Sequence, residues 1–190
     1  MMNVLGIVGS PRKDGNTAYL LERTLSFLPD SFQIETVFLK DYRIGPCEAC
    51  HRCEEDERCV LDDDMPRLYP KLQAADVMIL TSPVYMGGVT SRMRAFMERT
   101  WHLRKGQLAG KIGTYIVVGR RKPGAAIYAM EDYLARLRLT RLPGICGHAF
   151  HKGQIVADKE AVQEIERLAG DILGLGTGGA RPQSTNGSGR

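Results

Sequence analysis

The sequence predicts an α/β fold in one domain, with a parallel β-sheet covered by helices on both faces. Short apolar runs rich in β-branched residues alternate with amphipathic helical patterns five times along the chain. Alternation of this kind requires parallel strands joined by right-handed crossovers. The 190 residues suffice for one domain with a substantial core, and the 43% hydrophobic and 25% charged residues are those of a soluble globular protein.

The elements of the first half are predicted from short local patterns. Residues 3–9 (NVLGIVG) form an apolar run that ends in glycine, as expected of a strand buried on both faces. Residues 16–28 place leucines on one helical face and stop before Pro29, and residues 32–39 alternate as a second strand. The next helix is expected to begin at Asp62–Asp64, which can cap it, and to run to about residue 75.

The second half continues the alternation. Residues 77–81 (VMILT) predict a third buried strand, and residues 91–101 predict a helix with Met93, Phe96 and Met97 on one face. The remaining elements are expected in the order strand, helix, strand and helix, at residues 112–118, 125–137, 144–150 and 160–173.

One domain, residues 1–173, is predicted, with a cysteine-rich insertion at residues 44–62. Residues 174–190 have no apolar period and are rich in Gly, Ser and Arg, so we expect a disordered tail. No apolar run is long enough to cross a bilayer, and the first residues lack a signal pattern. We therefore expect a cytoplasmic protein with no membrane partner, in which thiols stay reduced.

The charge is small overall but unevenly distributed. A net charge of +4 is too low to indicate nucleic acid as a partner. Residues 48–64 hold eight acidic and two basic residues, a net of −6, whereas residues 99–141 hold ten basic and two acidic residues, a net of +8. Opposed patches of this kind can steer ligands or partners, although two solvated faces are the simpler interpretation.

A loop suited to binding phosphate joins the first predicted strand to the first predicted helix. In an open parallel sheet, ligands bind beyond the carboxyl ends of the strands, where an anion meets free amide groups and the positive end of a helix dipole. Gly15 lets the backbone turn closely around such an anion. The donors for the phosphate would be Ser10, Arg12, Asn16 and Thr17. The loop matches neither the Gly-x-Gly-x-x-Gly nor the Gly-Lys-Ser/Thr pattern, and a polar turn that only caps the helix is the alternative.

A second loop, residues 82–91 (SPVYMGGVTS), follows the third predicted strand directly. Pro83, Gly87 and Gly88 shape it so that backbone amides are exposed and can bind the edge of a flat heterocycle. Tyr85 offers a ring face to pack beside that heterocycle. The two loops together therefore predict a mononucleotide site.

Four cysteines stand within thirteen residues, in the pattern Cys47-x2-Cys50-x2-Cys53-x5-Cys59. A Cys-x2-Cys-x2-Cys run with a fourth cysteine nearby can enclose a [4Fe–4S] cluster, whereas zinc sites usually use two separated Cys-x2-Cys pairs. Zinc, redox-active thiols and cysteines that only pack beneath the loop remain the alternatives. Thiolates beside a nucleotide site indicate electron transfer between a flavin and an iron–sulfur cluster.

Gly-Ser-Pro-Arg-x-x-Gly-Asn-Thr followed by Ser-Pro-x-Tyr-x-Gly resembles the flavin loops of the flavodoxin-like NADPH-dependent FMN reductases. With the cysteine pattern between these loops, residues 1–173 resemble the iron–sulfur flavoprotein branch of that family. The resemblance implies a flavodoxin-like three-layer sandwich with a five-stranded parallel sheet in the order 2-1-3-4-5. It also implies FMN as cofactor and a homodimer or homotetramer.

Carried over to this chain, the resemblance assigns residues to each group. Ser10, Arg12, Gly15, Asn16 and Thr17 would hold the phosphate of FMN. The ring would lie against Pro83, Val84, Tyr85, Met86, Gly87 and Gly88, and Gly119 would lie beside the flavin's other edge. The cluster ligands would be Cys47, Cys50, Cys53 and Cys59. The loop after Gly119 carries the cations Arg120, Arg121 and Lys122, where many relatives have small residues, and these cations could attract NAD(P)H.

The expected function is an FMN-dependent oxidoreductase that moves electrons between FMN, a [4Fe–4S] cluster and an external donor or acceptor. No catalytic side chain is predicted, because the flavin carries the chemistry. The external partner would be a small molecule or a ferredoxin-like protein, with NAD(P)H as a potential donor. The alternatives are a cluster-free NAD(P)H-dependent FMN or quinone reductase, a non-enzymatic flavodoxin-type electron carrier and a zinc-held interaction module.

Overall fold

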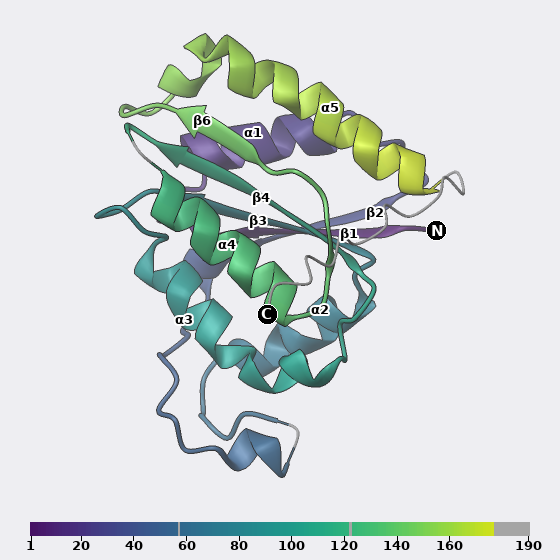
Figure 1. The fold of residues 1–190 in the computed structure, drawn as a ribbon, viewed down its shortest axis with the longest axis vertical. Coiled ribbons are helices and arrows are strands. Elements are labelled where there is room, and N and C mark those ends of the chain that lie inside the picture. Colours follow the sequence, from purple (N-terminus) through teal and green to yellow (C-terminus); the bar gives the residue numbers. More distant parts are fainter. Residues whose placement is uncertain (57, 122, 177–190) are drawn as a thin grey trace, which may run out of the picture.

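A parallel sheet in the order β2-β1-β3-β4-β5 forms the middle layer of the protein, and β6 also pairs with β4 (Figure 1). The structure is a computed structural model that describes residues 1–56, 58–121 and 123–176. The strands are β1 (Asn3–Val8), β2 (Gln33–Phe38), β3 (Val77–Pro83), β4 (Ile112–Gly119), β5 (Thr140–Arg141) and β6 (Ile145–His148). The helices are α1 (Asn16–Leu25), α2 (Tyr69–Ala74), α3 (Ser91–Arg99), α4 (Gly124–Arg136) and α5 (Lys159–Gly176).

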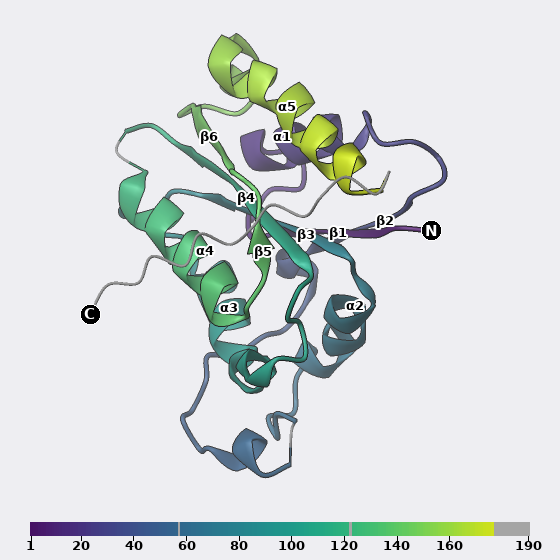
Figure 2. The same ribbon diagram turned by 45° about the vertical axis from the view of Figure 1, so that its right-hand side comes forward.

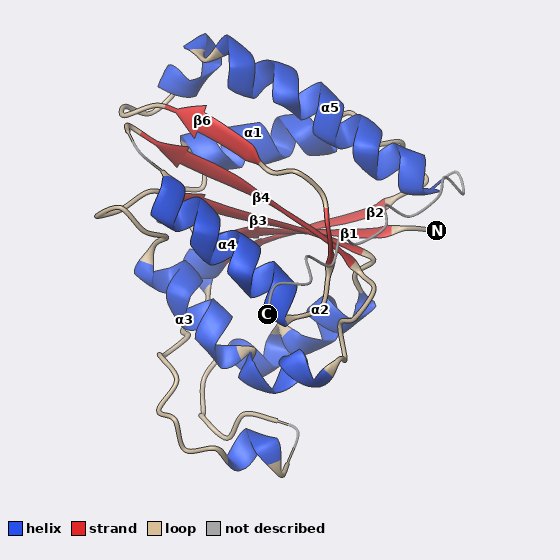
Figure 3. Cartoon of the chain, in the orientation of Figure 1, coloured by secondary structure: helices blue, strands red, loops and turns tan. Residues whose placement is uncertain are grey.

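Helices cover both faces of the sheet, as the alternating pattern predicts (Figure 3). Helices α1 and α5 pack on one face against side chains such as Val8, Ile79 and Ile116. Helices α2, α3 and α4 pack on the other face. They contact strand side chains that point the opposite way, such as Ile7 beside Val8 and Leu80 beside Ile79. Each central strand is therefore buried on both sides, which explains why the sequence shows continuous apolar runs.

Three predicted helices differ from the structure. Helix α1 ends at Leu25 rather than at residue 28, and α3 ends at Arg99 before a 3₁₀ turn, Trp101–Lys105. The helix expected from Asp62–Asp64 is divided into a 3₁₀ turn, Met65–Arg67, and the short α2. Pro70 lacks an amide hydrogen and cannot continue a helix across this junction.

The fifth position of the sheet is also divided. The predicted strand 144–150 shortens to β6, and the unexpected β5 pairs with the start of β4. Helix α5 extends to Gly176, three residues past the predicted end of the domain, and the rest of the predicted tail lies outside the described residues.

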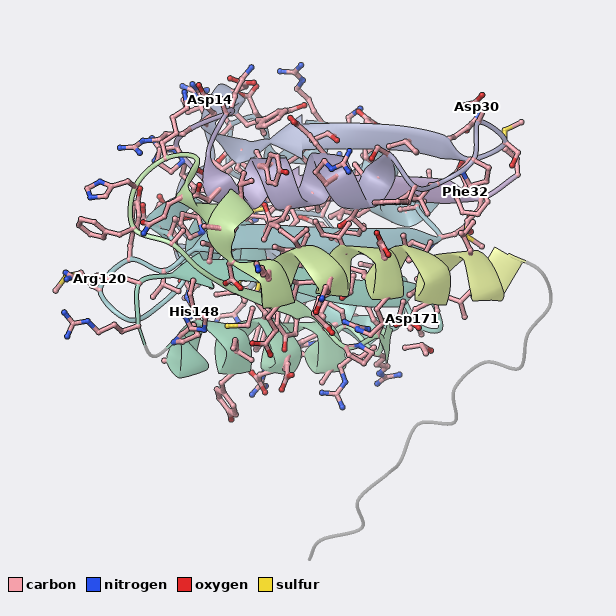
Figure 4. The ribbon with its side chains drawn as sticks, turned by 90° about the horizontal axis from the view of Figure 1, so that it is seen from above. Asp14, Asp30, Phe32, Arg120, His148 and Asp171 are labelled. Atoms are coloured by element: carbon pink, nitrogen blue, oxygen red, sulfur yellow. The ribbon has the colours of Figure 1, made fainter. Side chains whose placement is uncertain are left out.

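Strand register brings distant loops to one edge of the molecule. Val8 pairs with Thr81, Pro83 with Val118, and Gly119 with His148. The loops that follow β1, β3, β4 and β6 therefore begin side by side. Figure 4 shows Asp14, Arg120 and His148 toward this end, opposite Asp30 and Phe32.

The described residues of the segment 44–62 form a lobe of their own below α3 (Figures 1 and 2). Apart from a single 3₁₀ turn, Arg52–Glu54, the described residues of this lobe hold no regular element. The lobe lies away from α1 and α5 in both views.

Candidate functional site: a strand-end pocket and a cysteine pocket

The four strand-end loops enclose a pocket of about 440 Å³, a size that suits a small cofactor. Ten of the twelve residues predicted to contact the cofactor line it: Ser10, Arg12, Gly15, Asn16, Thr17, Pro83, Val84, Tyr85, Met86 and Gly119. Gly87 and Gly88 are not among its lining residues. The pocket unites loops that are more than a hundred residues apart in sequence.

Hydrogen bonds of Thr90 hold the first two loops together. The Thr90 hydroxyl donates to the carbonyl oxygen of Gly9 at 2.7 Å and accepts from the Met93 amide at 3.2 Å, which caps α3. The Thr90 amide donates to Ser82 Oγ at 3.0 Å. Because Thr90 and Ser82 are buried, the loop after β1 and the loop after β3 are fixed relative to each other.

The beginning of α1 is suited to an anion. Gly15 is its N-cap residue and has no side chain to cap the first amide groups, so the helix offers them to a ligand. The Thr17 hydroxyl is buried, and it has no hydrogen-bond partner among the residues that the structure describes. A buried hydroxyl without a partner is costly, and a phosphate oxygen would satisfy it. These residues therefore fit the phosphate of a mononucleotide.

Asn16 makes contacts that its sequence position did not predict. Its Nδ2 donates to the carbonyl oxygen of His151 at 2.9 Å, and its Oδ1 accepts from the Gly153 amide at 2.9 Å. The side chain thus ties the start of α1 to the loop after β6. Its predicted role as a phosphate ligand stays a prediction.

One wall of the pocket was not predicted. Ala149, Phe150 and Lys152 from the loop after β6 form it, beside Val118 and the predicted Arg120. The Arg120 guanidinium lies over the Phe150 ring, 5.0 Å from its centroid. The predicted strand 144–150 included Ala149 and Phe150, which in the structure belong to the loop after β6. The parallel topology by itself indicates that the loop after a fifth strand reaches the same edge.

The loop after β3 forms a tight turn at residues 85–88. Tyr85 and Gly88 exchange backbone hydrogen bonds of 2.9 and 3.0 Å, with positive φ at Met86 (49°) and Gly87 (82°). Gly87 suits this left-handed geometry, whereas Met86 is strained by it. Met86 is fully exposed and Tyr85 is 51% exposed, so both side chains stand at the mouth of the pocket.

The four cysteines lie together in a second pocket, in the lobe below α3. Cys47, Cys50, Cys53 and Cys59 all line one hollow of about 180 Å³, which Trp101 borders. Burial raises the pKa of the Cys53 thiol, and the neighbouring Cys59, Cys47 and Cys50 raise it further because like charges repel. In the part of the chain that the structure describes, no three Cys, His, Asp or Glu side chains are grouped to hold a single metal ion.

Residues of α3 and of the turn after it, which the sequence did not single out, anchor this lobe. Trp101 Nε1 and Arg104 donate to the Glu54 carboxylate at 3.3 and 3.4 Å, and Lys105 donates to the Glu54 carbonyl oxygen at 2.7 Å. The bonds from Trp101 and His51, with the charges of Arg104 and His51, hold the pKa of Glu54 below its ordinary value despite some desolvation. The buried Arg99 donates hydrogen bonds to two residues of the lobe, Gly45 and Cys59.

The fold and the strand-end pocket define a flavin-dependent oxidoreductase. Residues 2–151 match the NADPH-dependent FMN reductase family, and the chain belongs to that family. It is 34% identical over 139 residues to an iron–sulfur flavoprotein of Methanosarcina thermophila, covering 70% of this chain and 73% of the relative. It is 38% identical over 125 residues to an iron–sulfur flavoprotein of Methanocaldococcus jannaschii, covering 65% of each chain.

Solved structures share the fold at low sequence identity. An FMN-dependent NADH-azoreductase from Bacillus anthracis in complex with FMN superposes with a TM-score of 0.69 at 12% identity, over 90% of this chain and 99% of that one. An NADH:FMN oxidoreductase in its apo form superposes with a TM-score of 0.66 at 17% identity, over 93% of this chain and 90% of that one. The predicted flavodoxin-like sheet order and family are thereby confirmed.

Within the described residues, none of the helices combines the length and the apolar character that a bilayer span requires.

Proposed function

We propose that this chain is an iron–sulfur flavoprotein that moves electrons between FMN, a [4Fe–4S] cluster held by Cys47, Cys50, Cys53 and Cys59, and an external donor or acceptor. The observation that carries the proposal is that two separate pockets lie in one domain, one lined by the flavin motifs and the other by all four cysteines. Relatives that are named iron–sulfur flavoproteins support it.

The residues of the strand-end pocket would bind and orient FMN. The Thr17 hydroxyl, the first amides of α1 and Arg12 would hold the phosphate, and the turn from Tyr85 to Gly88 would lie beside the ring. Bound FMN supplies the hydride and single-electron chemistry, so no protein acid or base is required. The buried Val118 and Gly119 and the half-buried Val84 would exclude water from one side of the ring.

NAD(P)H is the proposed hydride donor. Besides Arg12, which is assigned to the FMN phosphate, Arg120 and Lys152 line the strand-end pocket, and cations there favour an anionic nucleotide. Lys152 is paired with Asp14, whereas Arg120 lies over Phe150 and Arg121 is exposed. Lys122, which was assigned the same role, lies outside the described residues. Stopped-flow reduction of the flavin by NADPH should slow in Arg120→Gln, and an unchanged rate would remove this donor role.

The chain would also form a homodimer or homotetramer. Met86, Tyr85 and Phe150 expose apolar surface at the mouth of the strand-end pocket, and a second subunit of a homodimer or homotetramer would cover it. Sedimentation of the wild type and of Met86→Glu tests this: the wild type should associate and the variant should not. The proposed external partner is a small molecule or a ferredoxin-like protein.

The first experiment measures iron, acid-labile sulfide and FMN in anaerobically purified protein. About four iron and four sulfide ions with one FMN per chain are expected for a [4Fe–4S] flavoprotein. Bound zinc without iron would instead favour the zinc alternative.

A second candidate function is a cluster-free NAD(P)H-dependent FMN or quinone reductase. It is favoured by the fact that the two pockets share no lining residue, so the flavin pocket does not depend on the cysteines. FMN without iron after attempted cluster reconstitution, with rapid quinone turnover, would make it the better account.

A further inference from the structure

Arg99 is a buried cation that directly contacts the cysteine pocket. It is the last residue of α3 and is only 2% exposed. Its Nε donates to Cys59 Sγ at 3.2 Å, and its Nη1 donates to the carbonyl oxygen of Gly45 at 3.1 Å. Both Nη atoms also donate to the carboxylate of Asp63, with Nη2 at 3.1 Å from Oδ1. Arginine is rarely buried, and here the contacts with a carboxylate, a carbonyl oxygen and a sulfur compensate for its burial.

Asp63 fixes the orientation of this guanidinium. Its carboxylate also accepts from the Gly45 and Met65 amides, each at 3.0 Å. Burial acts to raise the pKa of Asp63, but the bonds from Arg99 and from the two amides outweigh it, so the pKa lies below its ordinary value. A bidentate pair holds a planar guanidinium more rigidly than a single contact holds an ammonium group. The Nε–H is therefore aimed at the Cys59 sulfur by a rigid array.

The last two residues of α3 form hydrogen bonds with both the first and the last cysteine of the pattern. Glu98 Oε2 accepts from the amide of Cys47, the first cysteine, at 3.3 Å. Arg99, the next residue, bonds the sulfur of Cys59, the last cysteine. Two adjacent residues of one helix thus set the distance across the lobe, which has little regular structure of its own.

We propose that Arg99 is the positioning residue of Cys59, which it holds in the pocket, and that its N–H bond and charge raise the reduction potential of the cluster bound there. This inference rests on the proposed cluster. Hydrogen bonds to ligand sulfurs and the net charge around a cluster set its potential. A donor and a positive charge beside a thiolate favour the more negative, reduced state. The described acidic side chains of the lobe, Glu48, Glu54, Glu55, Asp56 and Asp62, act in the opposite direction. They are exposed and screened by solvent, whereas Arg99 is buried.

Two variants with opposite expected signs test the proposal. Arg99→Lys keeps the charge but loses the Nε–H and the planar fork, so the reduced state should be disfavoured. Asp63→Asn leaves the positive charge without its counter-ion, so the reduced state should be favoured. Arg104→Lys is the matched control, because Arg104 bonds Glu54 and no cysteine.

The measurements are iron and sulfide content, the rate of iron release to a chelator, and the cluster midpoint in an optical redox titration. In Arg99→Lys the reduced-to-oxidised ratio should fall about tenfold, which is ~59 mV for a one-electron couple. Iron release should become about tenfold faster, as when other groups that support a metal ligand are removed. Asp63→Asn should shift the midpoint upward, and Arg104→Lys should match the wild type.

The outcomes separate this inference from the function on which it rests. A wild-type protein without iron and sulfide after reconstitution overturns the proposed cluster. A loaded wild type whose midpoint equals that of Arg99→Lys overturns the role of Arg99 alone. A purely structural role predicts that Arg99→Lys and Asp63→Asn shift the midpoint in the same direction, and that result would also refute the proposal.

Discussion

The strand-end pocket and the cysteine lobe are held in place by different kinds of interaction. In the pocket, parallel strands place each loop, and the buried bonds of Thr90 fix two of these loops together. In the lobe, side chains of α3 and of the turn after it supply polar anchors, among them Arg99 and the partners of Glu54. Backbone placement therefore tolerates single changes, whereas a lobe anchored by side chains should depend on individual residues.

The largest effect is expected from removal of the lobe's anchor. Arg99→Ala leaves the Asp63 carboxylate buried without its partner, which should lower the free energy of unfolding by about 3–5 kcal/mol. Urea unfolding of the cluster-free protein measures this loss. The control is Arg104→Ala, which removes a partly exposed ion pair and should cost less than about 1 kcal/mol. Equal losses in the two variants would contradict the contrast between buried and exposed anchors.

The next effect concerns the strand-end pocket and should appear in binding rather than in stability. Thr17→Val removes the buried hydroxyl that has no partner among the described residues, so the apoprotein should be at least as stable as the wild type. FMN binding should weaken by about 1.5–3 kcal/mol, the usual value of a hydrogen bond to a charged group. Titration of apoprotein with FMN, followed by flavin fluorescence, measures the dissociation constant.

Thr24→Val is the matched control for that change. The Thr24 hydroxyl is also buried on α1, but it donates to the carbonyl oxygen of Leu20 at 2.8 Å, away from the pocket. This variant should lose some stability and keep its affinity for FMN. If Thr17→Val bound FMN as tightly as Thr24→Val, the phosphate would not lie at Thr17.

A smaller effect is expected where two loops of the pocket are joined. Asn16→Ala removes the bonds to His151 and Gly153, which should cost about 1–2 kcal/mol of local stability. Amide hydrogen exchange should quicken at Gly153 while the sheet stays protected. Unchanged exchange at Gly153 would show that the loop after β6 is held by other contacts.

The smallest expected effect is the pH dependence of the lobe. The pKa of Asp63 is lower in the folded protein than its ordinary value of 3.8, so its stabilisation is complete above that value and is lost as the pH falls through the folded pKa. Urea unfolding of the cluster-free protein at several acidic pH values should therefore show a slope that Asp63→Asn lacks. A slope of the same size in both proteins would assign the acid sensitivity to other carboxylates.

Local patterns in the sequence were enough for the order of elements and for most of the strand-end pocket. Apolar runs such as VMILT that alternate with helical patterns predict buried strands of an α/β sheet, and the loops after parallel strands meet at one edge. Ten of the twelve predicted cofactor residues accordingly line one pocket. Their contacts with FMN, and the metal ligation by the four cysteines, stay predictions.

Only the tertiary structure decided which distant side chains complete each site. Phe150 and Lys152 reach the strand-end pocket because β6 pairs with β4, and Arg99 reaches Cys59 across forty residues because α3 ends beside the lobe. No local pattern encodes these contacts, since they depend on how elements pack rather than on propensity or spacing. The sequence by itself determined the scaffold and the motifs, because strand and helix periodicity are local. The partners of Asn16, Cys59 and Asp63 required the folded chain, because a hydrogen bond or an ion pair is set by position in space.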